Sequence, residues 1–286
     1  MEVKNKTAEV LKTQRFQMLK DIAKEFSGEI NFPTSFDLTI RLRNTLEDPN
    51  WTLEQIASVI SVEPLISARL MGLANSVAYN PSAPEITDIK TAVVRLGLNL
   101  VRSTALAIAI DQMLHAKSVS VFKEHADWLW NHSLRTASAA YVLSKHHSTH
   151  NPDEAMLAGM IHDIGAFYML YRASLYDELR ERPDTVKYLS TQWHEHIGYT
   201  LLEALGMPEV IAEAIREHDL PRPVPTKLRS LADIIYVANL LAGGSSEWQY
   251  IDSITDEQII EITDEQYTDL IAEIDSYEKD IRTIFT

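Results

Sequence analysis

The chain has 286 residues, of which 45% are hydrophobic and 23% charged, with 9 glycines and 11 prolines. These proportions are those of an ordinary globular protein and exclude a mainly disordered chain or a collagen-like fibre. The 26 basic and 41 acidic residues give a net charge of −15, so the chain lacks the basic surface that nucleic-acid binding requires. Cysteine is absent, which excludes disulfides, thiolate zinc sites and a cysteine nucleophile.

Apolar runs are short throughout the sequence. The longest, Thr104 to Ile110, is broken by Asp111, well below the roughly 18 residues that span a bilayer. The first residues, Met1 to Lys6, lack the charged-then-apolar pattern of a signal peptide. We therefore expect a cytoplasmic protein without membrane contact.

Helix signals dominate the first half of the chain. Thr52 to Gln55 forms a capping box in front of an apolar face, and Pro64 fits the first turn of the next helix. Residues 90–96 are expected to form a helix that ends at Gly97. Residues 100–114 are apolar nearly all round, which predicts a buried helix.

The second half continues the same pattern, without convincing alternating strands. A helix that starts at Asn151 to Glu154 is expected to end at Gly165. The other helices are expected over residues 126–146, 195–205, 208–218 and 227–242. The sequence therefore predicts an all-α fold.

The segment 117–124 is polar and poor in apolar spacing, so we expect it to join two helical lobes. The predicted division is an N-terminal lobe over residues 1–118, a second lobe over 119–245 and an acidic extension over 246–286. From Glu247 onward the sequence contains twelve acidic residues and only two basic ones, Lys279 and Arg282. This extension should be helical because its apolar residues keep a helical stripe, at Leu270, Ile271, Ile274, Ile281 and Ile284.

An adjacent histidine and aspartate, His162 and Asp163, could carry chemistry. Neighbouring side chains on a helix point about 100° apart, so the two can meet one metal ion only where the helix end loosens. We expect Gly165 to provide that loosening; alternatively, the pair bridges two ions.

Four more donors lie on other predicted helices, at His132, His196, His218 and Asp233. Metal sites in helical bundles are assembled in this way, with donors from several helices. Imidazole and carboxylate ligands without thiolate favour iron, manganese, zinc or nickel, as one or two ions. Taken singly, each of these residues could also have an ordinary structural role without a metal. His132 could be a hydrogen-bonded core histidine, His218 a favourable charge at a helix C-terminus and Asp233 a surface acid.

The order His132, His162-Asp163, Asp233 resembles the HD superfamily of metal-dependent phosphohydrolases. The surrounding sequence segments match as well, notably Leu157 to Gly165 and Leu231 to Asp233. The resemblance is closer to the HDOD domain, a signalling relative of that superfamily. It extends over roughly residues 30 to 245 and includes Asp48-Pro49, Ala74-Asn75-Ser76, Ala92 to Gly97 and Gly206-Met207-Pro208.

The resemblance implies an N-terminal HDOD-type bundle, a C-terminal HD-like bundle and a role in bacterial signal transduction through protein partners. It also implies a retained metal site, in which His196 and His218 match the extra histidines of binuclear HD enzymes. Active HD phosphodiesterases of the HD-GYP type commonly place Lys where Ala166 stands here, and their Gly-Tyr-Pro segment is absent between Gly165 and Trp193. Arg135, one turn after His132, is a candidate replacement for that cation, although a surface arginine is the ordinary reading.

Three functions fit these residues. The first is a regulatory HDOD module that keeps a metal site and acts through a signalling partner. The second is a metal-dependent phosphohydrolase, in which Asp163 bridges the metals and metal-activated water attacks a phosphate ester or nucleotide. The third is a metal that only joins helices. We favour the first.

Overall fold

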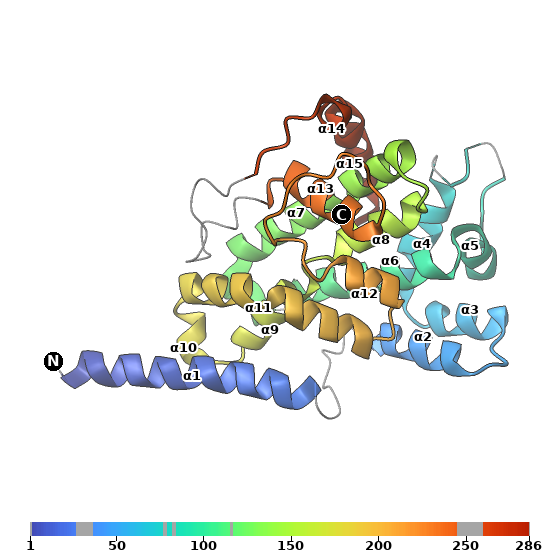
Figure 1. Cartoon of the computed structure of the whole chain (residues 1–286). Coiled ribbons are helices and arrows are strands. Elements are labelled where there is room, and N and C mark those ends of the chain that lie inside the picture. The colour runs from blue at the N-terminus through green and yellow to red at the C-terminus, as the bar shows by residue number, and fades with distance from the viewer. Residues whose placement is uncertain are drawn as a thin grey trace.

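The structure is a computed structural model that describes residues 2–26, 37–76, 79–81, 84–114, 117–244 and 260–285. These residues form helices, turns and loops and no strand, which confirms the predicted all-α class (Figure 1). The helices of the first half are α1 (Glu2–Phe26), α2 (Asp37–Glu47), α3 (Leu53–Ser61), α4 (Pro64–Asn75), α5 (Ile89–Leu96), α6 (Leu98–Leu114) and the 3-10 turn η2 (Val119–Phe122). Those of the second half are α7 (Lys123–His147), α8 (Pro152–Ile161), α9 (Ile164–Ala173), α10 (Asp177–Arg180), α11 (Pro183–Ala204), α12 (Glu209–Ala214), α13 (Leu231–Leu241), α14 (Glu265–Thr268) and α15 (Ile271–Phe285).

Helices α2 to α5 lie together at one side of the molecule (Figure 1). The predicted capping box begins α3, where Thr52 accepts from the backbone N–H of Gln55 and the Gln55 side chain accepts from the N–H of Thr52. Pro64 begins α4, as predicted. Helix α6 is buried along most of its length, in agreement with its uniformly apolar sequence.

The remaining core is built around α7, which packs against α8, α13 and α15, while α9 packs against α11. Two glycines permit the closest of these approaches. A Cβ at Gly159 would lie 2.9 Å from the Thr136 carbonyl oxygen on α7, and one at Gly165 would lie 1.9 Å from the His194 carbonyl oxygen on α11. The prediction that Gly165 ends a helix is therefore wrong: the helix ends at Ile161, and Gly165 lies in the first turn of α9.

The N-terminal helix α1 packs against α10 and α11 of the second half. Glu25 accepts hydrogen bonds from Tyr168 and Arg172 on α9, and Arg15 donates to Thr185 on α11. The predicted lobe boundary at 118/119 falls between α6 and η2 and stays a prediction.

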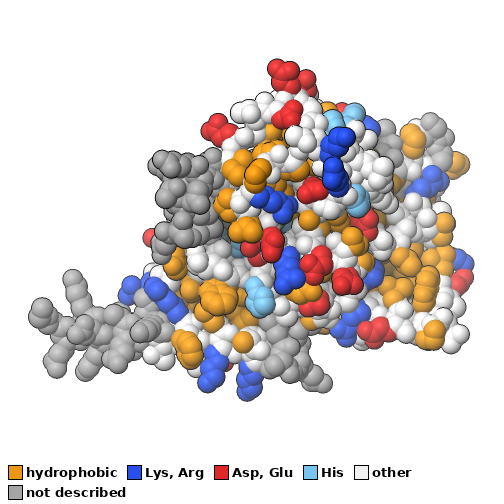
Figure 2. Space-filling model, viewed as in Figure 1, with side chains coloured by type: hydrophobic (Ala, Val, Ile, Leu, Met, Phe, Trp, Pro, Cys, Tyr) orange, Lys and Arg blue, Asp and Glu red, His pale blue; other side chains and the backbone are white. Residues whose placement is uncertain are grey.

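The C-terminal helix α15 lies along α7 (Figure 1). Asp275 and Glu278 pair with Arg135, Glu273 pairs with Lys145 at 2.8 Å, and Tyr277 stacks on Tyr141 at 4.1 Å between ring centroids. Figure 2 shows acidic side chains at the top of that view, where α14 and α15 lie. Residues 246–259 and 286 of the predicted acidic extension lie outside the described residues.

The helices in the described ranges are short or interrupted by polar residues. There, no helix taken alone is long and apolar enough to cross a bilayer; only two sharply bent pairs, α3 with α4 and α5 with α6, reach that length and apolarity together.

Candidate metal centre

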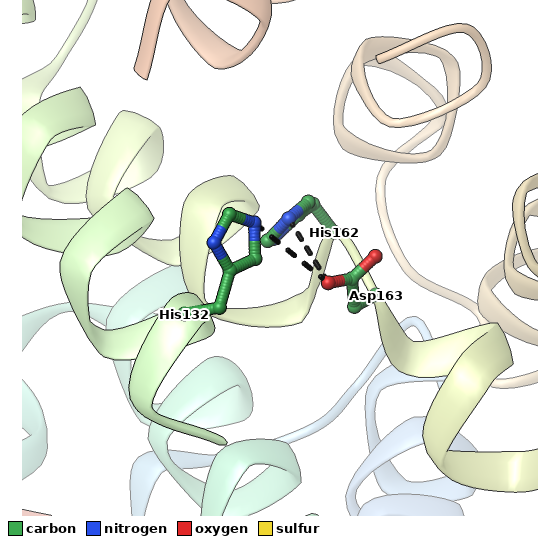
Figure 3. A group of neighbouring side chains, drawn as sticks. All are labelled: His132, His162 and Asp163. Carbon is green, nitrogen blue, oxygen red and sulfur yellow. Dashed lines mark ion pairs between the residues drawn. The ribbon is translucent and has the colours of Figure 1, made fainter. Parts of the chain in front are cut away.

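Three of the predicted donors meet in the core between α7 and the α8–α9 junction (Figure 3). His132 comes from the middle of α7, while His162 and Asp163 form the two-residue turn that separates α8 from α9. His162 Nε2 lies 3.2 Å and His132 Nε2 4.0 Å from Asp163 Oδ2. The break in the helix therefore lets the adjacent His162 and Asp163 face one point.

Asp163 joins this group to a second one. Its other oxygen, Oδ1, lies 3.5 Å from Nε2 of His194 on α11 and 3.3 Å from Nε2 of His218, which follows α12. Asp219 completes the second group, with Oδ2 3.3 Å from His194 Nε2. All six side chains are at most 6% exposed.

Three of the histidine rings are held in one orientation by the backbone. The Nδ1 atoms of His162, His194 and His218 lie 2.8, 3.0 and 2.7 Å from the carbonyl oxygens of Gly159, Ser190 and Ile215, each three or four residues upstream. A carbonyl can only accept, so each Nδ1 carries the hydrogen and each Nε2 directs a lone pair at the cluster. Metal-binding histidines in proteins are commonly fixed in this way.

The arrangement calls for a cation. Nε2 of His194 and Nε2 of His218 lie 3.2 Å apart, so two neutral rings would bring two lone pairs face to face. His162 Nε2, Asp163 Oδ2 and Asp219 Oδ2 are buried and have no hydrogen-bond partner. Unpaired buried polar atoms are costly, and a metal ion would satisfy several of them at once. The donor set therefore fits a divalent transition metal that accepts imidazole and carboxylate ligands.

Without a metal, a proton would take that place. Burial alone would lower the pKa of His218, but Asp219, Asp163 and Glu195 raise it to about 9. Burial would raise the pKa of Asp219, yet His218 and His194 lower it to about 2. His162, by contrast, is buried so deeply that its pKa falls to about 3, so it remains a neutral donor. Binding of a metal here would therefore release a proton from this cluster.

An asparagine on α13, Asn239, closes one side of the cluster. Its Nδ2 donates to Asp219 Oδ1 at 2.8 Å and to the His218 carbonyl oxygen at 3.2 Å. Its Oδ1 lies 2.8 Å from His132 Nε2. Asn239 is itself fully buried.

A stack of rings separates the cluster from solvent along α7. The Trp128 ring lies 5.3 Å from that of His132 at an interplanar angle of 2°, and the His125 ring stacks on the far side of Trp128. His125 and Trp128 line a cavity of about 310 Å³ together with Lys187. Trp128 is 37% exposed, whereas His132 behind it is 5% exposed.

Three predicted site residues lie elsewhere. Asp233 is the third residue of α13, where it forms a capping box with Ser230 and accepts from the backbone N–H groups of Arg229 and Ser230. His196 lies on the exposed face of α11. Arg135 is paired with Asp275 and Glu278 of α15. The structure does not group these three residues with His162 and Asp163, and a role for them at the site stays a prediction.

Sequence reasoning missed His194, Asp219 and Asn239. His194 precedes Ile197 and Gly198 by three and four residues, so it shares their buried helix face, and this spacing was visible in the sequence. Asp219 follows His218 as a second His-Asp pair, which was also visible. Nothing in the sequence pattern singled out Asn239.

The chain belongs to the HDOD domain family, whose match covers residues 32–221. A solved structure of a candidate metal-dependent phosphohydrolase from Shewanella amazonensis SB2B is 24% identical, with a TM-score of 0.63 over 93% of this chain and 99% of that one. An HDOD domain protein of unknown function from Geobacter sulfurreducens is 23% identical, with a TM-score of 0.54 over 93% and 97% of the two chains. At these identities the likeness shows a shared fold.

An uncharacterized protein of Treponema pallidum (strain Nichols) is 24% identical over 247 residues, or 80% of this chain. The present chain spans 45% of the length of that relative.

Proposed function

We propose that this chain is a regulatory HDOD module whose buried cluster binds a divalent transition metal and whose output passes through contacts with a signalling partner. The observation that carries the proposal is the pair of Nε2 atoms on His194 and His218, held 3.2 Å apart beside two buried carboxylates. The ligands we assign are Asp163, His194, His218 and Asp219; His162 lies with His132 at the other oxygen of Asp163.

These ligands come from separate segments of the chain. They lie on the α8–α9 junction, on α11 and on the segment after α12. An ion bound by all three segments would join them, and its loss would leave a proton in its place and buried carboxylate oxygens without a partner. Metal occupancy would therefore change the stability and packing of these helices, which is how such a module could report on metal or on a partner.

Burial favours regulation over turnover. The ligands are at most 6% exposed, and the adjacent cavity is lined by Trp128 and His125 and not by the ligands themselves. The alternative, a phosphohydrolase, draws support from the same donor set. A bound metal would polarise a phosphoryl oxygen and lower the pKa of water, while Asp163 would place one oxygen toward each group of histidines. A phosphate ester or nucleotide would then have to enter past Trp128.

Metal content and thermal stability test the proposal together. The protein is purified without added metal, analysed for metals, stripped with a chelator and reloaded with Mn²⁺, Fe²⁺, Ni²⁺ or Zn²⁺. We expect stoichiometric binding and a higher Tm in the loaded form. His194→Ala should abolish both effects, whereas the matched control His196→Ala, two residues away on the exposed face, should keep them. Failure of the wild type to bind any of these ions would overturn the metal centre.

A generic phosphodiester decides between the two functions. Bis(p-nitrophenyl) phosphate is incubated with the Mn²⁺-loaded protein, with His162→Ala and Asp163→Ala as controls. The regulatory proposal predicts no turnover above the variants. Turnover that both substitutions abolish would establish the hydrolase instead.

A further inference from the structure

We infer that this centre holds a single ion on the side of His194, His218 and Asp219, and that Asn239 keeps His132 out of the coordination sphere. This inference rests on the proposed metal centre and adds to it the number and position of the ions. Asp163 faces two groups of histidines, and the side chains of each group lie close enough together to hold an ion.

The orientation of the Asn239 amide is fixed by its neighbours. Two acceptors, Asp219 Oδ1 and the His218 carbonyl oxygen, lie 2.8 and 3.2 Å from one end of the amide. Neither acceptor has a hydrogen to donate while Asp219 is ionised, so this end must be the NH₂ group. The other end, directed at His132, is therefore the carbonyl oxygen.

The amide orientation determines the state of His132. Asn239 Oδ1 lies 2.8 Å from His132 Nε2, so Nε2 must carry a hydrogen and donate it. A protonated ring nitrogen has no lone pair for a metal. The other ring nitrogen, Nδ1, also faces an acceptor, the Ala242 carbonyl oxygen, but at the longer distance of 3.3 Å, so the hydrogen of a neutral His132 ring is assigned to Nε2. His132 therefore acts as a hydrogen-bonded core histidine, although it lies within ligand distance of Asp163.

Charge leads to the same result. The two buried carboxylates of the cluster, Asp163 and Asp219, balance one divalent ion. A second divalent ion beside His132 would leave two uncompensated positive charges in the core, since Asn239 contributes no charge, and an unpaired buried charge is strongly unfavourable. A carboxylate at position 239 would supply both a negative charge and an acceptor that can bind a metal.

The test is the metal stoichiometry of the full chain, measured by elemental analysis after reloading with Zn²⁺ or Mn²⁺. We expect one ion per chain in the wild type, one in His132→Ala and two in Asn239→Asp. Two ions in the wild type, loss of the ion in His132→Ala, or one ion in a folded Asn239→Asp would each overturn the inference and leave the metal centre standing. No ion in the wild type would instead overturn the metal centre itself.

A second measurement does not depend on whether Asn239→Asp folds. In ¹⁵N-labelled, Zn²⁺-loaded wild-type protein, the His132 ring should keep a slowly exchanging Nε2–H signal that is absent from the spectrum of His132→Ala. The Nε2 atoms of His194 and His218 should carry no hydrogen in the loaded form. Disappearance of the His132 Nε2–H signal on Zn²⁺ loading would show that His132 is a ligand and overturn the inference.

Discussion

A methyl group at Gly165 should disturb the fold and the site together. In Gly165→Ala the new Cβ would lie 1.9 Å from the His194 carbonyl oxygen and 2.6 Å from the Gly198 nitrogen, both of them backbone atoms of α11. Because contacts below 3.0 Å are essentially never seen, α11 must move away from α9 by about 1 Å. Overpacking of this kind costs about 1–3 kcal/mol of the free energy of unfolding.

The same displacement would move His194 away from Asp163; in the structure, His194 Nε2 lies 3.5 Å from Asp163 Oδ1. Displaced supporting contacts typically lower metal affinity by about 10–100-fold. At about 2–4 °C per kcal/mol, the Tm of the metal-free protein should fall by roughly 2–12 °C.

The assays are thermal unfolding of the metal-free protein and a Zn²⁺ titration monitored by calorimetry. The matched control is Gly72→Ala on α4, where a Cβ would meet no atom within 4 Å. That change should raise stability by up to about 1 kcal/mol, as expected for Gly to Ala in a helix, and leave metal affinity unchanged. Wild-type Tm and affinity in Gly165→Ala would refute the reasoning that this contact positions His194.

Three other predictions concern pH, the C-terminal helix and access to the site. The pKa of His218 is raised to about 9, so its contribution to the stability of the metal-free protein is complete below pH 6.5 and lost as the pH rises toward 9. The pKa of His162 is lowered to about 3, so stability also falls as the pH drops from 6.5 toward 3. The urea midpoint of the metal-free protein should therefore be highest near pH 6.5. Arg135→Ala should lower the free energy of unfolding by about 1 kcal/mol and leave metal content unchanged, because its partners lie on partly exposed α15. Trp128→Ala should speed the removal of metal by a chelator, since the indole covers His132.

Each of these predictions has its own control. A urea midpoint that rises steadily from pH 6.5 to 9 in the metal-free protein would contradict the role of His218. Loss of metal in a folded Arg135→Ala would return Arg135 to the site. Trp193→Ala removes an exposed indole from α11 and should leave the rate of metal removal unchanged, so equal acceleration in both variants would contradict a covering role for Trp128.

Local sequence signals predicted most of the helices correctly because their physical cause is local. The capping box at Thr52 and the first-turn proline at Pro64 each begin a helix as expected. A helix end was predicted at Gly165, but the break lies between Ile161 and Ile164, where no residue of the apolar sequence marks it. This break in the helix lets the adjacent side chains of His162 and Asp163 face the same point.

The site was predicted in part, and each error has an identifiable cause. His132, His162, Asp163 and His218 do come together, as the resemblance implied. The sequence prediction named His196 and left His194 out, although two residues on a helix point about 200° apart and the buried neighbours Ile197 and Gly198 favour His194.

Asp233 is predicted as a ligand because it is a carboxylate in a segment, Leu231 to Asp233, that resembles the HD superfamily. Ser230 three residues before it forms a capping box, a local use that accounts for this carboxylate fully. The place beside His132 is taken by the amide of Asn239, which only the packing of α13 against α7 reveals.

The most direct test of the account is anomalous diffraction from crystals of the metal-loaded protein, recorded at the absorption edge of the metal. We predict one peak per chain, about 2.0–2.2 Å from Nε2 of His194 and of His218 and within bonding distance of Asp163. A peak confined to surface residues, or no peak at the cluster in crystals soaked with excess metal, would contradict the claim that these side chains form a metal centre.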